Sequence, residues 1–211
     1  FFFLKNIFFQ SMPITIAILG YSIAATVVFT YVGLFGEYAV AGYGSATRIE
    51  QVVLLPILGI NTAIISIIAQ NIGAKYYDRV EQSYFTSIKY GLFIMLIAGV
   101  VIFISADIVP KFFSSNPEVI MHGSMYLKIS AFILPAYPIF FLSNGFFMAL
   151  KKSEKAMVNN IARNVIVPVL SFYIAKYLNA DFKTFFYIWA IFQWLISCLL
   201  YTSPSPRDIR W

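Results

Sequence analysis

The sequence predicts an all-α fold, a polytopic membrane helical bundle with six transmembrane helices. Of its 211 residues, 60% are hydrophobic and only 11% are charged, whereas soluble domains carry about 25% charged residues. Apolar runs of about 20 residues, long enough to cross a bilayer, recur along the chain. Backbone groups in lipid have no water partner, so runs of this length form helices. The expected spans are about 12–34, 42–71, 84–108, 121–149, 157–178 and 184–200.

A membrane β-barrel is the alternative fold, and its strands would show about 10 residues of alternating polarity. Segment 91–104, GLFIMLIAGVVIFI, is apolar on all sides and therefore favours a helix. Prolines within or at the ends of the spans remove backbone donors and can bend a helix. They are either ordinary membrane-helix composition or hinges of a bundle that changes shape. These prolines are Pro13, Pro56, Pro135, Pro138 and Pro168.

The loop charges predict an orientation for the bundle. If the spans are hairpinned, one side carries six basic residues and the other side carries three. The positive-inside rule places the richer side in the cytoplasm. The richer side holds Lys5, Lys75, Arg79, Lys151, Lys152 and Lys155, and the other side holds Lys111, Lys176 and Lys183.

Three features are expected near the outer ends of the spans. In SSNPEV, Asn116 is a possible helix cap and Pro117 takes the first helical position. Asp107 and Lys111 are four residues apart and can pair on a helix surface. His122 has no partner at metal-binding spacing and is expected at the surface.

Composition argues against several classes of function. The net charge of +6 could suggest nucleic acid, but the chain has no run rich in lysine or arginine. His122 is the only histidine and Cys198 the only cysteine, which excludes zinc clusters, Cys/His nucleophiles and disulfide frameworks. The acidic residues are scattered, without the paired carboxylates or activated nucleophile of a membrane enzyme. We therefore predict no enzyme activity, no cofactor, no metal site and no nucleic-acid partner.

The two ends of the chain carry their own predictions. The opening FFFLKNIFFQ is not a signal peptide, and residues 1–197 are expected to form one domain. Segment 198–208 matches a translated sequencing adapter residue for residue, so 198–211 is interpreted as a non-native read-through tail. A genuine polar C-terminus is the alternative. We expect the natural protein to extend beyond both ends.

The most informative stretch is 41–79, where Arg48, Glu50 and Gln51 lie inside an otherwise apolar helix. An ionisable group at membrane depth costs roughly 2.5–3.5 kcal/mol on insertion scales, so such groups tend to face a bundle interior or a wet cavity. A carboxylate held there can take up and release a proton near neutral pH. Glu50 is therefore either an ion-transport residue or a structural partner of another helix.

Segment 39–80 resembles the second helix of the C-terminal lobe in the multidrug and toxic compound extrusion (MATE) family. The shared order is a small-residue entry, Arg-Ile, Pro-x-x-Gly and Gln-Asn-x-Gly-Ala followed by a basic residue. Further matches follow at 112–129, at Pro135 and at 149–152. The resemblance implies that residues 1–197 are the C-terminal six-helix lobe of a two-lobe, twelve-helix transporter. Its partners would be the lipid bilayer and a missing N-terminal lobe of the same chain.

The resemblance also implies a function. Members are secondary active antiporters that export small amphipathic or cationic organic compounds against a proton or sodium gradient by alternating access. This lobe alone would be inactive, and the expected location is a prokaryotic inner membrane. The alternatives are a lipid-linked oligosaccharide flippase of the same superfamily and a non-transporting assembly subunit. A flippase cavity needs several cations for a pyrophosphate, and only Arg48 and Arg163 lie at suitable depth.

The chain departs from the sodium-coupled members, which carry acids midway along the first and fourth helices of this lobe. The corresponding places hold Tyr21 and, near Phe140, no acid; Asn144 is the nearest polar side chain. This departure leaves Glu50 as the acid deep in a span. Ion coupling would then depend on Glu50 or on acids of the missing lobe.

Each of the remaining polar residues in the spans has two possible roles, one in the transport pathway and one in structure. Gln51 and Asn61 either line the pathway or join helices by hydrogen bonds worth about 0.6 kcal/mol. Arg163 either meets an acid or an anionic headgroup, or extends to the interface. Tyr21 either faces a substrate cleft, where aromatic rings attract organic cations, or packs in the core. The candidate substrate and ion pathway residues are Glu50, Tyr21, Gln51, Asn61, Asn144 and Arg163.

Overall fold

The computed structural model describes residues 2–201, which form helices joined by short turns. Three long helices come first, then a broken pair, a helix with a π-helical turn inside it, and a last helix. In chain order they are α1 (Phe2–Gly33), α2 (Glu37–Gly73), α3 (Tyr77–Ser105), the 3₁₀ turn η1 (Val109–Phe112), α4 (Pro117–Ile133), α5 (Ala136–Ala149), α6 (Ser153–Ile161), the π turn η2 (Ala162–Ile166), α7 (Val167–Tyr177) and α8 (Phe182–Tyr201).

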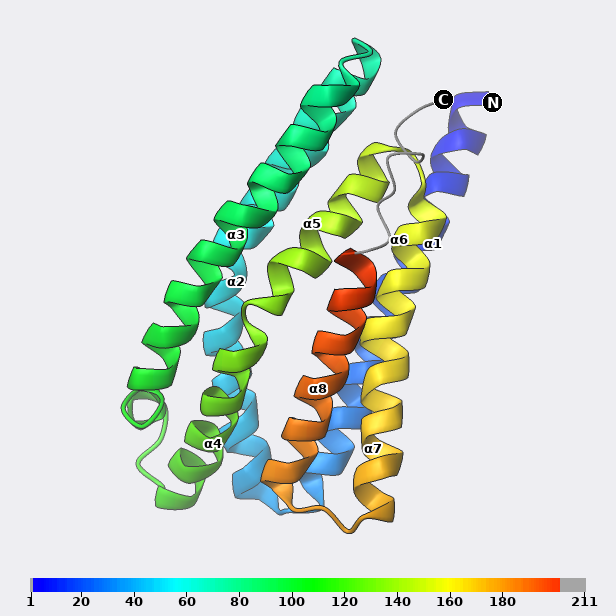
Figure 1. Ribbon diagram of the computed structural model, residues 1–211. Coiled ribbons are helices and arrows are strands. Elements are labelled where there is room, and N and C mark those ends of the chain that lie inside the picture. The colour runs from blue at the N-terminus through cyan, green and yellow to red at the C-terminus, as the bar shows by residue number, and fades with distance from the viewer. Residues whose placement is uncertain (1, 202–211) are drawn as a thin grey trace.

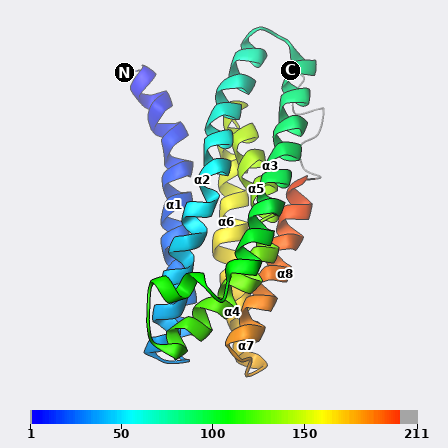
Figure 2. The ribbon, with the colours of Figure 1, turned by 90° about the vertical axis from the view of Figure 1, so that its left-hand side faces the viewer.

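The helices run up and down as an antiparallel bundle (Figure 1). The N-terminal end of α1, the turn after α2 and the turn between α5 and α6 lie at one end of the bundle. The turn after α1, the η1 region and the connection from α7 to α8 lie at the other end. The loops that carry Lys75 and Lys151 thus share one end, as the hairpinned arrangement predicts. Helices α1 and α2 meet near Gly33 and diverge from there, as Figures 1 and 2 both show.

Four helical stretches are long and apolar enough to cross a membrane: α2, α3, α6–α7 (Ser153–Tyr177) and α8. A fifth is the bent pair α4–α5, if the pair counts as one span. In α1, the apolar stretch among the residues with described side chains is Leu19–Gly33, which is shorter than a membrane span. Each of the six expected segments therefore matches a helix or helix pair, but four or five of them reach membrane length among the described side chains.

The expected span at 121–149 is not one straight helix, because α4 and α5 meet at a bend of 55°. Pro135 has no N–H to donate to the carbonyl of Ala131, which ends the regular helix there. Neighbouring helices accommodate the break: the Trp194 indole donates to the Phe132 carbonyl at 2.8 Å. The Ala131 carbonyl oxygen lies so close to Gly99 of α3 that a Cβ at Gly99 would be 2.7 Å away. By contrast, α2 continues through Pro56 without a break.

The core of the lower half is a cluster of aromatic rings between α1, α2, α4 and α8. The ring of Tyr31 stacks on Phe185 at 4.2 Å between centroids, and Tyr43 stacks on Phe186 at 5.3 Å. Offset and edge contacts of this kind add about 0.5–1.5 kcal/mol to the burial of each ring. A second core lies between α2, α3, α5 and α6, and its buried members are Ile64, Ile68, Val80, Tyr84, Ile88, Leu142, Phe146, Phe147 and Ala156.

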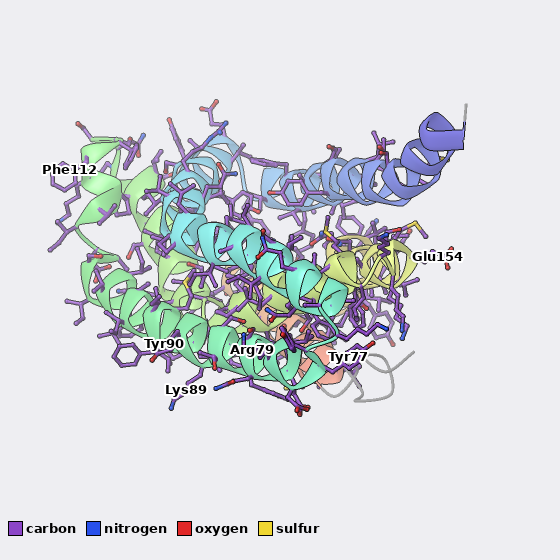
Figure 3. All side chains as sticks on the ribbon, turned by 90° about the horizontal axis from the view of Figure 1, so that it is seen from above. Tyr77, Arg79, Lys89, Tyr90, Phe112 and Glu154 are labelled. Carbon is purple, nitrogen blue, oxygen red and sulfur yellow. The ribbon has the colours of Figure 1, made fainter. Side chains whose placement is uncertain are left out.

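The outward side of α3 carries apolar side chains that suit a lipid environment. Lys89 and Tyr90 project away from the bundle in Figure 3, and Tyr90 is 61% exposed. Further along α3 the exposed residues are apolar: Phe93, Leu96, Ile97, Val100, Val101, Phe103 and Ile104. An exposed apolar band of this length is expected where a helix faces lipid rather than water.

The outer ends of the spans confirm one expectation and correct two. Asn116 caps α4 by accepting a hydrogen bond from the Glu118 amide at 2.9 Å, and Pro117 takes the first helical position. The expected pair of Asp107 with Lys111 is replaced by an ion pair with Lys128 at 2.7 Å. His122 is half-buried against the Phe182 ring rather than at the surface.

Helix α8 is described to Tyr201, so the first residues of the expected read-through tail continue a helix. Cys198 is exposed on it. The rest of that tail, 202–211, lies outside the described residues, and its non-native origin stays a prediction.

Candidate functional site

A cavity of about 580 Å³ lies between α1, α2, α4, α5, α6, η2 and α8. Its volume is within the range of about 300–1,000 Å³ that is typical of small-molecule sites. Most of its lining is apolar or aromatic, with a small number of polar groups. The residues that the argument below uses are Tyr21, Glu50, Gln51, Tyr126, Tyr137, Phe140, Asn160, Arg163, Trp189 and Gln193.

Glu50 is buried at this cavity and is bound by two tyrosines. The hydroxyl of Tyr126 donates to its Oε2, and the hydroxyl of Tyr137 donates to its Oε1. Both carboxylate oxygens therefore have a protein donor, which offsets the cost of holding a carboxylate at membrane depth.

The bend between α4 and α5 brings these two tyrosines to one carboxylate. Residues 11 positions apart in a straight helix lie on nearly the same face but about 16 Å apart along the axis. Tyr126 belongs to α4 and Tyr137 to α5, with the 55° bend between them. The site at Glu50 thus depends on the proline break, and not only on the residues of α2.

Arg163 is the second charged residue of the cavity, and it is only 3% exposed. Its guanidinium carbon lies 4.1 Å from the centroid of the Phe140 ring and 4.4 Å from that of Tyr137. Its Nε donates to the Gln193 side-chain oxygen at 2.5 Å. Cation–π contacts of a desolvated guanidinium are worth about 2 kcal/mol, so the ring faces and the Gln193 amide hold this cation inside the bundle.

Tyr137 connects the two charged groups. Its hydroxyl binds Glu50 while its ring covers the guanidinium of Arg163. A change of charge at Glu50 therefore alters the hydrogen bond of Tyr137, the residue whose ring packs against Arg163. The cavity contains one acid and one base that share a single aromatic neighbour.

The π turn η2 carries Arg163 and its neighbour Asn164. A π turn inserts one extra residue into an α-helix, and such turns are frequent at functional sites. Helix α1 packs closely here, since a Cβ at Gly20 would lie 2.9 Å from a methyl group of Val165. The first half of the span, α6, and the second half, α7, are thus offset where Arg163 enters the cavity.

The structure brings four of the six sequence candidates together. Tyr21, Glu50, Gln51 and Arg163 all line the cavity. Arg163 does not extend to the interface, so that reading is wrong. Whether these four act in transport stays a prediction.

Asn61 and Asn144 lie outside the cavity lining. The side-chain oxygen of Asn61 is buried without a hydrogen-bond donor among the described residues, and it packs against Gly145. Asn144 accepts a hydrogen bond from Asn159 at 3.5 Å, which joins α5 to α6. The contacts of Asn144 resemble those of interhelical polar pairs.

Sequence reasoning missed Tyr126, Trp189 and Gln193 as site residues. Gln193 is a polar residue inside the apolar run of α8, and that pattern is the signal that could have indicated it. Tyr126 and Trp189 carry no such signal, because aromatic residues are common throughout the chain. Their role depends on which helices pack together.

The fold defines a class: a multi-pass integral membrane protein with an aromatic-lined cavity between its helices. The MatE family model matches residues 13–173, so the chain belongs to the MatE family. The probable multidrug resistance protein YpnP of Bacillus subtilis is 26% identical over 162 residues, which cover 77% of this chain and 34% of YpnP. A FAD transporter of Shewanella oneidensis is 24% identical over 145 residues, 69% of this chain and 32% of that protein. The chain thus spans about a third of the length of these relatives.

Solved structures share the fold. The MATE transporter ClbM, determined with Rb⁺, superposes with a TM-score of 0.90 at 19% identity, over 99% of this chain and 49% of ClbM. A MOP superfamily transporter from Pyrococcus furiosus superposes with a TM-score of 0.86 at 22% identity, over 90% of this chain and 43% of that one. The all-α bundle predicted from the sequence is thereby confirmed.

Proposed function

We propose that this chain is the C-terminal lobe of a proton-coupled antiporter that exports small amphipathic organic compounds. The observation that carries the proposal is Glu50, the one carboxylate among the described residues that line the cavity. Two relatives are named for multidrug resistance or multidrug export. Their names support an amphipathic substrate, and the aromatic lining of this cavity supports it independently.

Alternating access supplies the coupling step. In the outward-open state Glu50 takes up a proton and the substrate leaves; in the inward-open state the proton leaves and substrate binds. Protonation of the carboxylate removes its charge and adds an O–H donor beside the two tyrosine hydroxyls, which weakens their hydrogen bonds and favours a rearrangement. Tyr137 would transmit that rearrangement to α5 and to Arg163.

A proton fits this arrangement better than sodium. Both carboxylate oxygens of Glu50 already accept a hydroxyl hydrogen, whereas a hard cation needs several free oxygen lone pairs at one point. The flippase alternative is not favoured, because Arg163 is the one cation among the described cavity-lining residues. Arg48 is exposed and lies outside that lining.

The test uses the full-length parent protein in proteoliposomes, with an imposed pH gradient and a fluorescent amphipathic dye. Glu50→Gln should reduce gradient-driven dye export at least tenfold, while Glu37→Gln, an exposed acid at the start of α2, should leave it within twofold. Export driven by a sodium gradient at constant pH, or full export by Glu50→Gln, would contradict the proposal. The 211-residue chain alone should give no flux.

A further inference from the structure

We propose that the cavity contains an anion subsite centred on Arg163, which selects amphipathic aromatic compounds that carry one carboxylate, sulfonate or phosphate group. This names a substrate class for the cavity, and its relevance to export rests on the proposed function above. Binding of such compounds can be measured without transport.

The charge balance of the cavity is the first argument. Glu50 and Arg163 are the two charged residues among its described lining. Within residues 2–201, the Arg163 guanidinium has no carboxylate oxygen within 4.0 Å. A buried cation without an ion-pair partner is costly in a low-dielectric site, and a ligand anion would remove that cost.

Glu50, in contrast, is already bound by protein donors. Tyr126 and Tyr137 each occupy one of its oxygens. A cationic ligand would have to compete with both hydroxyls for this carboxylate. The acid of the cavity is therefore less available to a ligand than the base.

The guanidinium is also oriented for an anion. Its Nε is used by Gln193, and its faces are covered by the rings of Phe140 and Tyr137. The Tyr137 side chain also lies within hydrogen-bond reach of the guanidinium, and the terminal nitrogens of an arginine form the fork that binds two oxygens of a carboxylate or phosphate. A guanidinium fixed by stacking loses little freedom when it binds.

A second donor lies beside it. Trp189 lines the cavity, and its indole Nε1–H is buried without an acceptor among the described residues. Trp189 is one helical turn from Gln193, so both residues share a face of α8. Because Gln193 binds Arg163, the indole donor without an acceptor and the guanidinium line the same cavity. The aromatic rings around them would hold the apolar part of the ligand.

The experiment compares two probes of the same shape and opposite charge, 2-naphthoate and 2-naphthylmethylammonium. Binding to the full-length parent protein, purified in dodecyl maltoside, is measured by equilibrium dialysis. The naphthoate should bind at least tenfold more tightly than the ammonium compound. Equal affinities, or tighter binding of the ammonium compound, would overturn the subsite.

Substitutions then locate the subsite. Arg163→Gln should weaken naphthoate binding about tenfold to a hundredfold, the range for a charged hydrogen-bonded contact, and should leave the ammonium compound unchanged or bound more tightly. Arg48→Gln is the matched control, an exposed arginine of α2, and should change neither affinity by more than twofold. Arg163→Lys keeps the charge without the fork and should retain part of the preference.

A second variant, Glu50→Gln, distinguishes misfolding of Arg163→Gln from loss of the subsite, because it removes the charge that opposes anion binding and leaves Arg163 in place. This variant should bind naphthoate at least threefold more tightly and the ammonium compound more weakly. An equal loss of both probes in Arg163→Gln, or unchanged naphthoate binding in Glu50→Gln, contradicts the proposal. This second variant decides the matter if Arg163→Gln does not fold.

Two sources of the anion are distinguished by competition. Phosphatidylglycerol that displaces naphthoate in the wild type, and does so less effectively in Arg163→Lys, identifies a lipid headgroup as an occupant of the subsite. Naphthoate binding that persists in the presence of phosphatidylglycerol identifies a soluble ligand. Failure of anion binding with intact dye export would refute the subsite alone, whereas failure of export with intact anion binding would refute the antiporter.

Discussion

At the scale of single residues, Glu50 shows how a carboxylate can be kept inside an apolar helix. Its two oxygens accept hydrogen bonds from two tyrosine hydroxyls, which come from two different helices, α4 and α5. Hydrogen bonds to charged groups contribute more to the free energy of unfolding than hydrogen bonds between neutral groups, about 1.5–3 kcal/mol each. The tyrosines therefore stabilise the contact of α2 with the α4–α5 pair in addition to any role in proton transfer.

The first prediction is a coupling between Tyr126 and Glu50. Tyr126→Phe removes one donor and should lower the free energy of unfolding by about 1.5–3 kcal/mol. In a Glu50→Gln background the same change should cost less, because the charge is gone. Thermal unfolding in detergent measures the double-mutant cycle. Tyr90→Phe, on the exposed side of α3, is the control, and additive effects of the pair would contradict the coupling.

The sequence predicted part of this site and missed the rest for a physical reason. The insertion cost of an acid indicated that Glu50 faces the interior, and the structure places it in the cavity. Its partners could not be predicted, since Tyr126 and Tyr137 meet there only because α4 and α5 bend. Arg163 was misjudged because its contacts come from α5 and α8, and the sequence does not show how these helices pack against the π turn.

At the scale of elements, the bend between α4 and α5 depends on close packing against α3. The Ala131 carbonyl lacks a helix donor because Pro135 has no N–H, and it fits against Gly99. A side chain at this glycine would push α3 and α4 apart.

The second prediction compares two glycines. Gly99→Ala should destabilise the bundle, because its Cβ would lie 2.7 Å from the Ala131 oxygen. Gly59→Ala in α2 meets no atom within 4 Å and should stabilise by up to about 1 kcal/mol, the usual gain of alanine over glycine in a helix. The midpoint of thermal unfolding in detergent measures both. A stabilising Gly99→Ala would show that the contact is not tight.

The third prediction concerns the start of α8. The Asp181 carboxylate accepts a hydrogen bond from the Thr184 amide at 3.1 Å, which is the arrangement of an N-cap. Hydrogen bonds from the Thr184 side chain and backbone lower the pKa of Asp181 below its ordinary value of 3.8. A lowered pKa means that the cap contributes fully above pH 3.8, and that the contribution is lost as the pH falls through the folded value.

Asp181→Ala should therefore lower the free energy of unfolding by about 0.5–2 kcal/mol at pH 7, and the difference from the wild type should shrink below about pH 4. Asp181→Asn keeps a capping oxygen and should lie between the two at pH 7. Thermal unfolding at pH 7 and pH 3 tests this. A difference that grows on acidification would have the wrong sign.

At the scale of the whole molecule, the positions of the basic loops predict how the bundle sits in the membrane. The turns near Lys75 and Lys151 lie at one end, and η1 and the α7–α8 connection lie at the other (Figure 1). The positive-inside rule puts the first end in the cytoplasm.

The fourth prediction tests that orientation by labelling. In a Cys198→Ser background, Lys75→Cys should react with an impermeant maleimide only after cells are opened. Lys111→Cys should react in intact cells. The opposite pattern would show that the bundle is inverted.

The sequence predicted the whole bundle better than its details. Apolar run lengths placed a helix or a helix pair at every expected segment, since lipid leaves the backbone no other choice. Run length could not show the break at Pro135, because proline is common in continuous membrane helices and α2 passes Pro56 unbroken. Nor could it show the π turn, which has no composition of its own.

That π turn sets a rule for how the length of the chain can vary. Each residue of an α-helix adds about 100° of rotation. A π turn takes up about one extra residue within a single turn, so the helices on its two sides keep nearly the same facing. Removing one residue between 162 and 166 would therefore restore a regular helix and leave α6 and α7 close to their present register, with Asn160 still at the cavity. The same deletion within the regular part of α6 would instead rotate the helix by about 100°. In this span, the effect of a deletion depends on whether the π turn can absorb it.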